Sequence, residues 1–178
     1  MSRYEIRYGA VGGQGLLTAG ALLVDIAVTR ENKFAVESPT YTASVRGGAT
    51  KVDIIISDKK ILFPQASAID FFVCTQQKPF DLYKDRLKES ATVIIDSHLV
   101  KELGNTHNWK LYRIPIIYET KKQVGNIVLT SVVTLSLTQK LTGIISYRNM
   151  VDYIKKWAPP DYIDLNLKAI EVGRELVS

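Results

Sequence analysis

The sequence predicts an α/β fold: a single three-layer α/β/α domain over residues 1–178 with a central, mostly parallel or mixed sheet. Short runs rich in Val, Ile and Phe are almost continuously apolar, which is typical of strands covered on both faces. Longer segments with helical spacing of apolar residues lie between and after these runs. At 178 residues and 46% hydrophobic composition, the chain can build one core without disulfides. The order of these segments favours two helical layers around a sheet.

The first half of the chain predicts four strands and one buried helix. Tyr4–Val11 alternates between polar and apolar residues and is predicted to be a strand. Leu16–Arg30 is apolar almost all round, so we expect a largely buried helix there. Three short β-branched or aromatic runs are the other predicted strands: Thr50–Asp58, Ile69–Thr75 and Ala91–Asp96.

The second half is predicted to be mainly helical. Pro79 can begin a helix over Pro79–Glu89, in which Phe80, Tyr83 and Leu87 share one face. Leu111–Ile117 is a strand candidate, and its Pro115 favours a sheet edge or a strand end. Three further helices are predicted: Asn126–Leu141 closed by Gly143, Ser146–Ala158, and Asp161–Val177.

Composition excludes several classes of protein. The single cysteine, Cys74, lies in an apolar run and is expected in the core, and one cysteine cannot hold an iron–sulfur cluster or a disulfide framework. The chain shows no signal-peptide pattern and no apolar stretch of the roughly 18 residues that a membrane span needs. We therefore expect a cytoplasmic protein without membrane contact. The net charge of +5 is spread along the chain, which favours a solvated surface over a nucleic-acid interface.

Five of the eleven glycines fall in one segment, Gly9–Gly20, with the sequence GAVGGQGLLTAG. A strand, a glycine-rich turn and a helix together present backbone N–H groups to an anion such as a phosphate. The turn lacks the lysine of a Walker loop, and Thr18 stands where the dinucleotide fingerprint has its third glycine. Two interpretations stay open. The turn serves only helix–sheet packing, or its backbone and Gln14 meet a ligand or a partner subunit.

A second unusual segment, Ser38–Thr50, is polar, rich in small residues and contains Tyr41. Arg46 directly precedes Gly47 and Gly48, which places a fixed cation beside a pliable backbone. This pairing suits a phosphate or carboxylate. The alternative is a surface arginine at a hairpin turn leading into the strand at Thr50.

Together the two segments resemble the gamma subunit of 2-oxoacid:ferredoxin oxidoreductases, the pyruvate, 2-oxoglutarate and ketoisovalerate family. That family has a Gly-Gly-Gln-Gly turn before an Ala-Gly-x-Leu-Leu helix, then a tyrosine and an Arg-Gly-Gly before a strand ending Ile-Ser-Asp. The matching residues here are Gly12, Gly13, Gln14, Gly15, Ala19, Gly20, Leu22, Leu23, Tyr41, Arg46, Gly47, Gly48, Ile56, Ser57 and Asp58. The segment Tyr162–Leu176 looks like the tail of the 2-oxoglutarate branch. Thr42 and Ser44 stand where the family usually has glycine and glutamate.

The resemblance implies a non-catalytic subunit of a complex that converts a 2-oxoacid and coenzyme A to acyl-CoA and carbon dioxide. Thiamine diphosphate and iron–sulfur clusters are then expected in alpha- and beta-type partners, with or without a delta-type subunit, and ferredoxin accepts the electrons. By analogy, coenzyme A or a subunit contact is expected at Gly12–Gly15, with Tyr41 and Arg46–Gly48 beside it. The chain itself is expected to carry no catalytic residue, metal ligand or resident cofactor. The alternatives are a stand-alone nucleotide-binding protein and a pure interaction module.

Four isolated polar residues are weaker candidates. His98 and His107 have no acidic or cysteine partner nearby in the sequence and are expected to be exposed or to cap a turn. Asp96 ends a predicted strand, where α/β folds bind ligands, but is expected to cap a turn or helix instead. Asp25 lies in the apolar helix and must either face outward or find a partner.

Overall fold

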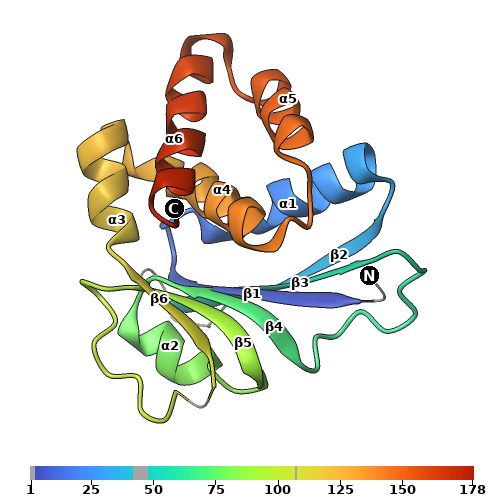
Figure 1. Ribbon diagram of the computed structural model, residues 1–178, viewed down its shortest axis with the longest axis vertical. Helices are drawn as coiled ribbons and strands as arrows, with labels where there is room; N and C mark the ends of the chain where they lie inside the picture. Colours follow the sequence, from blue (N-terminus) through green and yellow to red (C-terminus); the bar gives the residue numbers. More distant parts are fainter. Residues whose placement is uncertain (1–2, 42–47, 107) are drawn as a thin grey trace.

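The computed structural model describes residues 3–41, 48–106 and 108–178, which form a six-stranded mixed sheet (Figure 1). The strand order is β2-β3-β1-β4-β5-β6. The central strand β1 pairs antiparallel with β3 and parallel with β4. On the β4 side, β5 and β6 continue the parallel pairing, and on the other side β2 pairs antiparallel with β3. The bounds are β1 Tyr4–Val11, β2 Phe34–Tyr41, β3 Ala49–Ser57, β4 Ile69–Cys74, β5 Leu87–Asp96 and β6 Lys110–Ile114.

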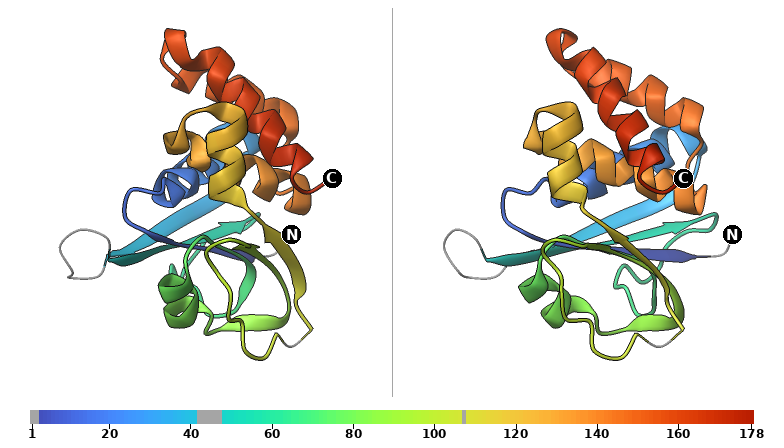
Figure 2. Two further views of the ribbon diagram at one scale, coloured as in Figure 1. Left: turned by 90° about the vertical axis from the view of Figure 1, so that its left-hand side faces the viewer. Right: turned by 60° about the vertical axis from the view of Figure 1, so that its left-hand side comes forward.

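Helices cover the two faces of this sheet unequally (Figures 1 and 2). One face carries the helices α1 Leu16–Glu31, α3 Ile116–Glu119, α4 Thr130–Thr142, α5 Tyr147–Trp157 and α6 Ile163–Glu175. A π-helical turn over Thr120–Val124 follows α3, and 3-10 turns over Ile127–Leu129 and Pro160–Tyr162 precede α4 and α6. Of the helices in the described residues, the other face carries only the short helix α2, Gln77–Tyr83. In the described part of the chain, no helix has both the length and the apolarity to cross a membrane.

Two apolar clusters hold the layers together. The larger one lies between the sheet and α1, α4 and α6, and includes Leu23, Ile54 and Phe71. The smaller one lies under α2, where the Phe80 ring stacks on Phe72 with centroids 6.0 Å apart. Cys74 belongs to this second cluster and is fully buried, which confirms its expected place in the core.

A buried ion pair joins the centre of the sheet to the end of α2. Arg7 on β1 is only 2% exposed and donates to both carboxylate oxygens of Asp53 on β3, at 2.6 and 3.0 Å. Its remaining guanidinium nitrogen donates to the backbone carbonyls of Tyr83 and Asp85. Burial by itself would raise the pKa of Asp53, but hydrogen bonds from Arg7 and Lys51 hold that pKa below its usual range.

This ion pair explains one wrong prediction. The sequence predicts a helix over Pro79–Glu89, whereas α2 ends at Tyr83 and the chain has entered β5 by Leu87. Arg86 between them takes a left-handed conformation with φ of 62°, which a continuing helix cannot contain. The Arg7 guanidinium donates to the carbonyls of Tyr83 and Asp85, so the carbonyls that a continuing helix would use for its own hydrogen bonds are bound to the sheet instead.

Two elements were not predicted from the sequence. Edge strand β2 contains Pro39 and a mixed polar pattern, and α3 follows β6 without a periodic apolar signal of its own. The other predicted elements are present, but β5 starts four residues earlier than predicted, and the strand predicted over Leu111–Ile117 ends at Ile114, with Ile116 and Ile117 in α3. The predicted mixed sheet between helices is confirmed, although one of its helical layers is a single short helix.

Candidate functional site

The glycine turn joins the end of β1 to the start of α1. Gly13 and Gly15 have φ of 93° and 78°, a left-handed region in which any other residue is strained. Gly15 immediately precedes α1, and no side chain of residues 3–40, 48–106 or 108–178 caps that helix end. The first turn of α1 also contains no acidic residue. Its free N–H groups and the positive end of the helix dipole therefore face the turn.

Packing accounts for some glycines of this segment but not for all. A Cβ on Gly20 would lie 2.9 Å from Cγ1 of Val52, so this glycine allows α1 to lie close to β3. A Cβ on Gly12 would have no described heavy atom within 4 Å, and its φ is not left-handed. The interpretation of the turn as packing alone thus explains Gly20 and leaves Gly12 unexplained.

Gln14 holds the turn against the sheet. Its side-chain oxygen accepts hydrogen bonds from the Val11 N–H at 3.0 Å and from the Thr75 hydroxyl at 2.7 Å. Thr75 is fully buried at the end of β4, and its own N–H donates to the carbonyl of Gly9. The carbonyl half of Gln14 is therefore committed to the protein, while its amide N–H groups have no hydrogen-bond partner among the described residues.

A hollow of about 270 Å³ lies over the turn and is lined by residues 10–18 together with Thr50 and Val128. Val128 belongs to the 3-10 turn before α4, and the Asn126 side chain caps that turn by accepting from the Val128 N–H. A Cβ on Gly15 would lie 3.2 Å from the Val128 carbonyl oxygen, so the starts of two helices meet beside the hollow. Sequence reasoning missed Thr50, Thr75 and Val128, because only the fold brings these three to the turn.

The second predicted segment meets the turn at its end. The Gly12 N–H donates to the carbonyl of Gly48 at 3.3 Å, which places these two predicted site residues side by side. Tyr41 is the last residue of β2 and pairs with Thr50, but its side chain is not among those described. Arg46 and Gly47 lie outside the described residues, as do Thr42 and Ser44.

The weaker candidates have structural partners. Asp96 is fully buried and caps the turn after β5, where one carboxylate oxygen accepts from the His98 N–H and the other from the Ile117 N–H. This confirms the expectation that Asp96 caps a turn. The His98 side chain is exposed, with its ring 5.3 Å from that of Tyr118, and Asp25 faces outward and accepts from the Tyr153 hydroxyl. His107 lies outside the described residues.

Comparison with known proteins gives a consistent result. A family model described as pyruvate ferredoxin/flavodoxin oxidoreductase matches residues 5–176. The 2-oxoglutarate synthase subunit KorC of Methanocaldococcus jannaschii is 34% identical, over 98% of this chain and 94% of its own length. Among solved structures, the gamma subunit of a keto/oxoacid ferredoxin oxidoreductase from Geobacter sulfurreducens superposes with a TM-score of 0.89 at 33% identity, covering 99% of this chain and 97% of that one.

A second solved structure shows the same fold within a longer chain. The 2-oxoglutarate:ferredoxin oxidoreductase from Magnetococcus marinus, solved with 2-oxoglutarate, coenzyme A and succinyl-CoA bound, matches with a TM-score of 0.85 at 19% identity. The match covers 99% of this chain but only 31% of that chain. At this identity the likeness extends to the fold alone.

Proposed function

The chain belongs to the pyruvate ferredoxin/flavodoxin oxidoreductase family, and from that premise we propose that it serves as the gamma-type subunit of a 2-oxoacid:ferredoxin oxidoreductase. The observation that carries this proposal is the end-to-end match to KorC of Methanocaldococcus jannaschii, at 34% identity. The complex converts a 2-oxoacid and coenzyme A to an acyl-CoA and carbon dioxide, and 2-oxoglutarate is the first substrate to test.

The redox chemistry belongs to companion subunits in this proposal. An iron–sulfur cluster needs several cysteine thiolates, and this chain has the single, fully buried Cys74. Burial raises the pKa of the Cys74 thiol to about 12, so the thiol stays protonated at neutral pH and is a poor nucleophile. Thiamine diphosphate and the clusters are therefore assigned to alpha- and beta-type partners, which pass electrons to ferredoxin.

The glycine turn is the proposed site for the diphosphate of coenzyme A. Exposed backbone at Gly12 and Gly13 lets an anion approach closely, and the uncapped start of α1 supplies N–H donors and a positive dipole. A volume of about 270 Å³ is just below the range of about 300–1,000 Å³ for small-molecule pockets. The hollow is therefore suited to the diphosphate, while the rest of coenzyme A extends over the surface or onto a companion subunit. Tyr41 and Arg46–Gly48 are proposed as the second contact.

Purification of the native chain under anaerobic conditions tests the assignment to a complex. We expect equal amounts of a thiamine diphosphate subunit and an iron–sulfur subunit to accompany the chain, together with ferredoxin reduction that requires 2-oxoacid and coenzyme A. Elution of the chain alone from native extracts, with no such partner, would contradict the proposal.

The coenzyme A contact is tested in the assembled enzyme with Arg46→Glu. Reversing this charge should raise the apparent KM for coenzyme A and leave the KM for the 2-oxoacid unchanged. Arg148→Glu is the matched control, because the Arg148 side chain on α5 is 90% exposed and lies outside the proposed site. Equal KM values for coenzyme A in both variants and the unmodified enzyme would remove Arg46 from the site.

A further inference from the structure

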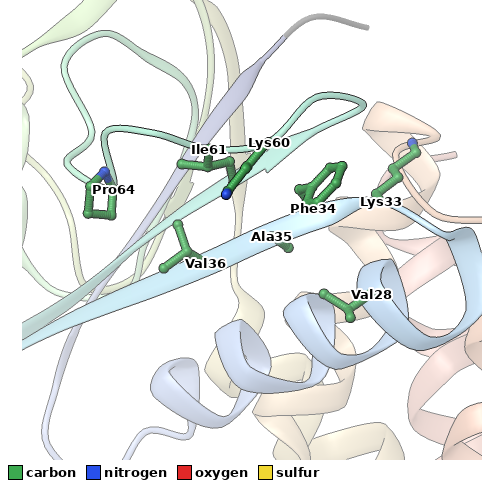
Figure 3. Close-up of a pocket in the computed structure, with 8 residues that line it drawn as sticks. All are labelled: Val28, Lys33, Phe34, Ala35, Val36, Lys60, Ile61 and Pro64. Atoms are coloured by element: carbon green, nitrogen blue, oxygen red, sulfur yellow. The ribbon is translucent and has the colours of Figure 1, made fainter.

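A second hollow, of about 380 Å³, follows the outer edge of β2 (Figure 3). Strand β2 is the edge strand at the opposite end of the sheet from β6. Val28 of α1 forms one wall, and Ile61 and Pro64 of the β3–β4 connection form the other. The floor is the start of β2, Phe34–Val36, with Lys33 and Lys60 at the rim. We call this hollow the β2 groove. It opens along a strand edge and has apolar walls on both sides of that strand.

The backbone along this groove has unused hydrogen-bonding capacity. Strand β2 pairs with β3 on one side and has no neighbouring strand among the described residues on the other, so alternate residues direct N–H and C=O groups outward. For the described part of the chain, no hydrogen bond outside the β2–β3 ladder involves the backbone of residues 34–38. Pro39 has no N–H to donate. The usable edge is therefore the first half of β2, the half that lines the groove.

Exposed apolar side chains gather around the same edge. Val28 and Phe34 are 46% and 49% exposed, and Phe63 and Leu62 in the adjoining connection are 60% and 85% exposed. A surface leucine or phenylalanine alone needs no explanation. Here Val28 and Phe34 line the groove, and Leu62 and Phe63 lie in the chain between its wall residues Ile61 and Pro64, so the exposed apolar side chains together indicate an interaction site. An extended chain fits this surface, because its side chains point alternately to two faces and would meet both walls.

We propose that an extended segment of a companion subunit pairs with the outer edge of β2 as an additional strand and packs apolar side chains against both walls of the groove. This inference rests on the proposed function, since it takes the companion from the same oxidoreductase. Main-chain hydrogen bonds to β2 give affinity in this mode of binding, and the alternate side chains give specificity.

Charge favours a companion subunit over a second copy of this chain. Lys60 lies at the rim of the groove and Lys59 precedes it, both exposed, and the described residues include no ion pair to either. Two copies meeting edge to edge would bring these lysines together, whereas a partner with a carboxylate beside its apolar residues would be attracted.

Subunit retention in the assembled complex tests the proposal. Lys60→Glu changes an exposed side chain at the rim of the groove, and Leu62→Glu changes one next to the wall residue Ile61, so both variants should fold normally and lose about 30-fold in affinity for the companion, the scale of one interface hot spot. Lys60→Arg keeps the charge and should be retained like the unmodified chain. Leu82→Glu on α2 is the matched control, because Leu82 is 51% exposed and lies away from the groove. Thermal melting of each isolated variant checks the fold.

Hydrogen exchange separates strand pairing from contact through side chains alone. The outward amides within residues 34–38 should exchange more slowly in the complex than in the isolated chain, and unchanged exchange would overturn the strand pairing. Unaltered retention of Leu62→Glu and Lys60→Glu would overturn the groove as the interface while leaving the assignment as a gamma-type subunit intact. A third outcome is that the isolated chain self-associates, that Leu62→Glu abolishes this self-association, and that companion retention is unaffected. That outcome would identify a second copy of this chain, and not a companion subunit, as the occupant of the groove. Failure of the unmodified chain to recover any companion would instead overturn the proposed function itself.

Discussion

Alanine substitutions along the glycine turn can separate what the fold requires from what a ligand requires. At Gly15, alanine would take a left-handed conformation that costs about 1–2 kcal/mol, and its Cβ would press on the Val128 carbonyl at 3.2 Å. At Gly13 the conformational cost is similar, but an added Cβ would have no described heavy atom within 4 Å. At Gly12 neither cost applies. We therefore expect the free energy of unfolding to fall most in Gly15→Ala, less in Gly13→Ala and hardly at all in Gly12→Ala.

Thermal melting of the three purified variants measures this order. In a domain of this size, 1 kcal/mol lowers Tm by about 2–4 °C, so Gly13→Ala should lose about 2–8 °C and Gly15→Ala somewhat more. Gly12→Ala should melt within about 2 °C of the unmodified chain, because replacing an unstrained glycine mainly restricts the unfolded state. A large loss of Tm in Gly12→Ala would refute the reasoning. An unchanged Tm with weaker binding of coenzyme A in the complex would show that Gly12 is needed for the ligand.

Three further predictions concern the interior. Burial, and to a smaller extent the nearby Asp25, raises the pKa of Glu37, so the ionised form disfavours folding. Glu37→Gln should therefore raise Tm at neutral pH; in melts at several pH values, the gain should shrink as the pH falls below the raised folded-state pKa and vanish below the unfolded pKa of about 4.3. The Cys74 thiol should not react with a thiol reagent at mildly alkaline pH until denaturant unfolds the chain, because burial raises its pKa to about 12. Gly173→Ala should lower the free energy of unfolding by about 1–3 kcal/mol in denaturant titrations, because its Cβ would lie 2.5 Å from the Val133 carbonyl where α6 crosses α4.

Local patterns were sufficient where one segment decides its own structure. Tyr4–Val11 matches β1 residue for residue, and Ser146 begins α5 by accepting from the Asn149 N–H, as expected for a capping serine. Patterns failed where a distant residue decides. The helix predicted over Pro79–Glu89 stops early because Arg7, on another strand, binds the carbonyls of its end. No window of sequence around Pro79 contains that information.

The candidate site shows the same division. Glycine spacing located the turn, because left-handed conformations at Gly13 and Gly15 are properties of those residues themselves. Thr75 and Val128 come from separate parts of the chain and reach the turn only through the parallel pairing of β1 with β4 and the packing of α4 beside α1. The apolar groove at the edge of β2 could not be predicted from the sequence either, since the strand itself was not predicted.

Helix α1 connects the two proposed surfaces and fixes the distance between them. It begins beside Gly15 at the turn, and Val28 near its other end forms a wall of the β2 groove. At about 1.5 Å per residue, Leu16 and Val28 are about 18 Å apart along the helix axis. Substitutions separated by more than about 10 Å without shared partners usually act independently. Gly12→Ala combined with Leu62→Glu should therefore show the coenzyme A defect of the first and the retention defect of the second, each at the size measured alone. A combined effect much larger than the two separate ones would mean that docking at the groove orders the turn, and would place α1 in the role of the coupling element.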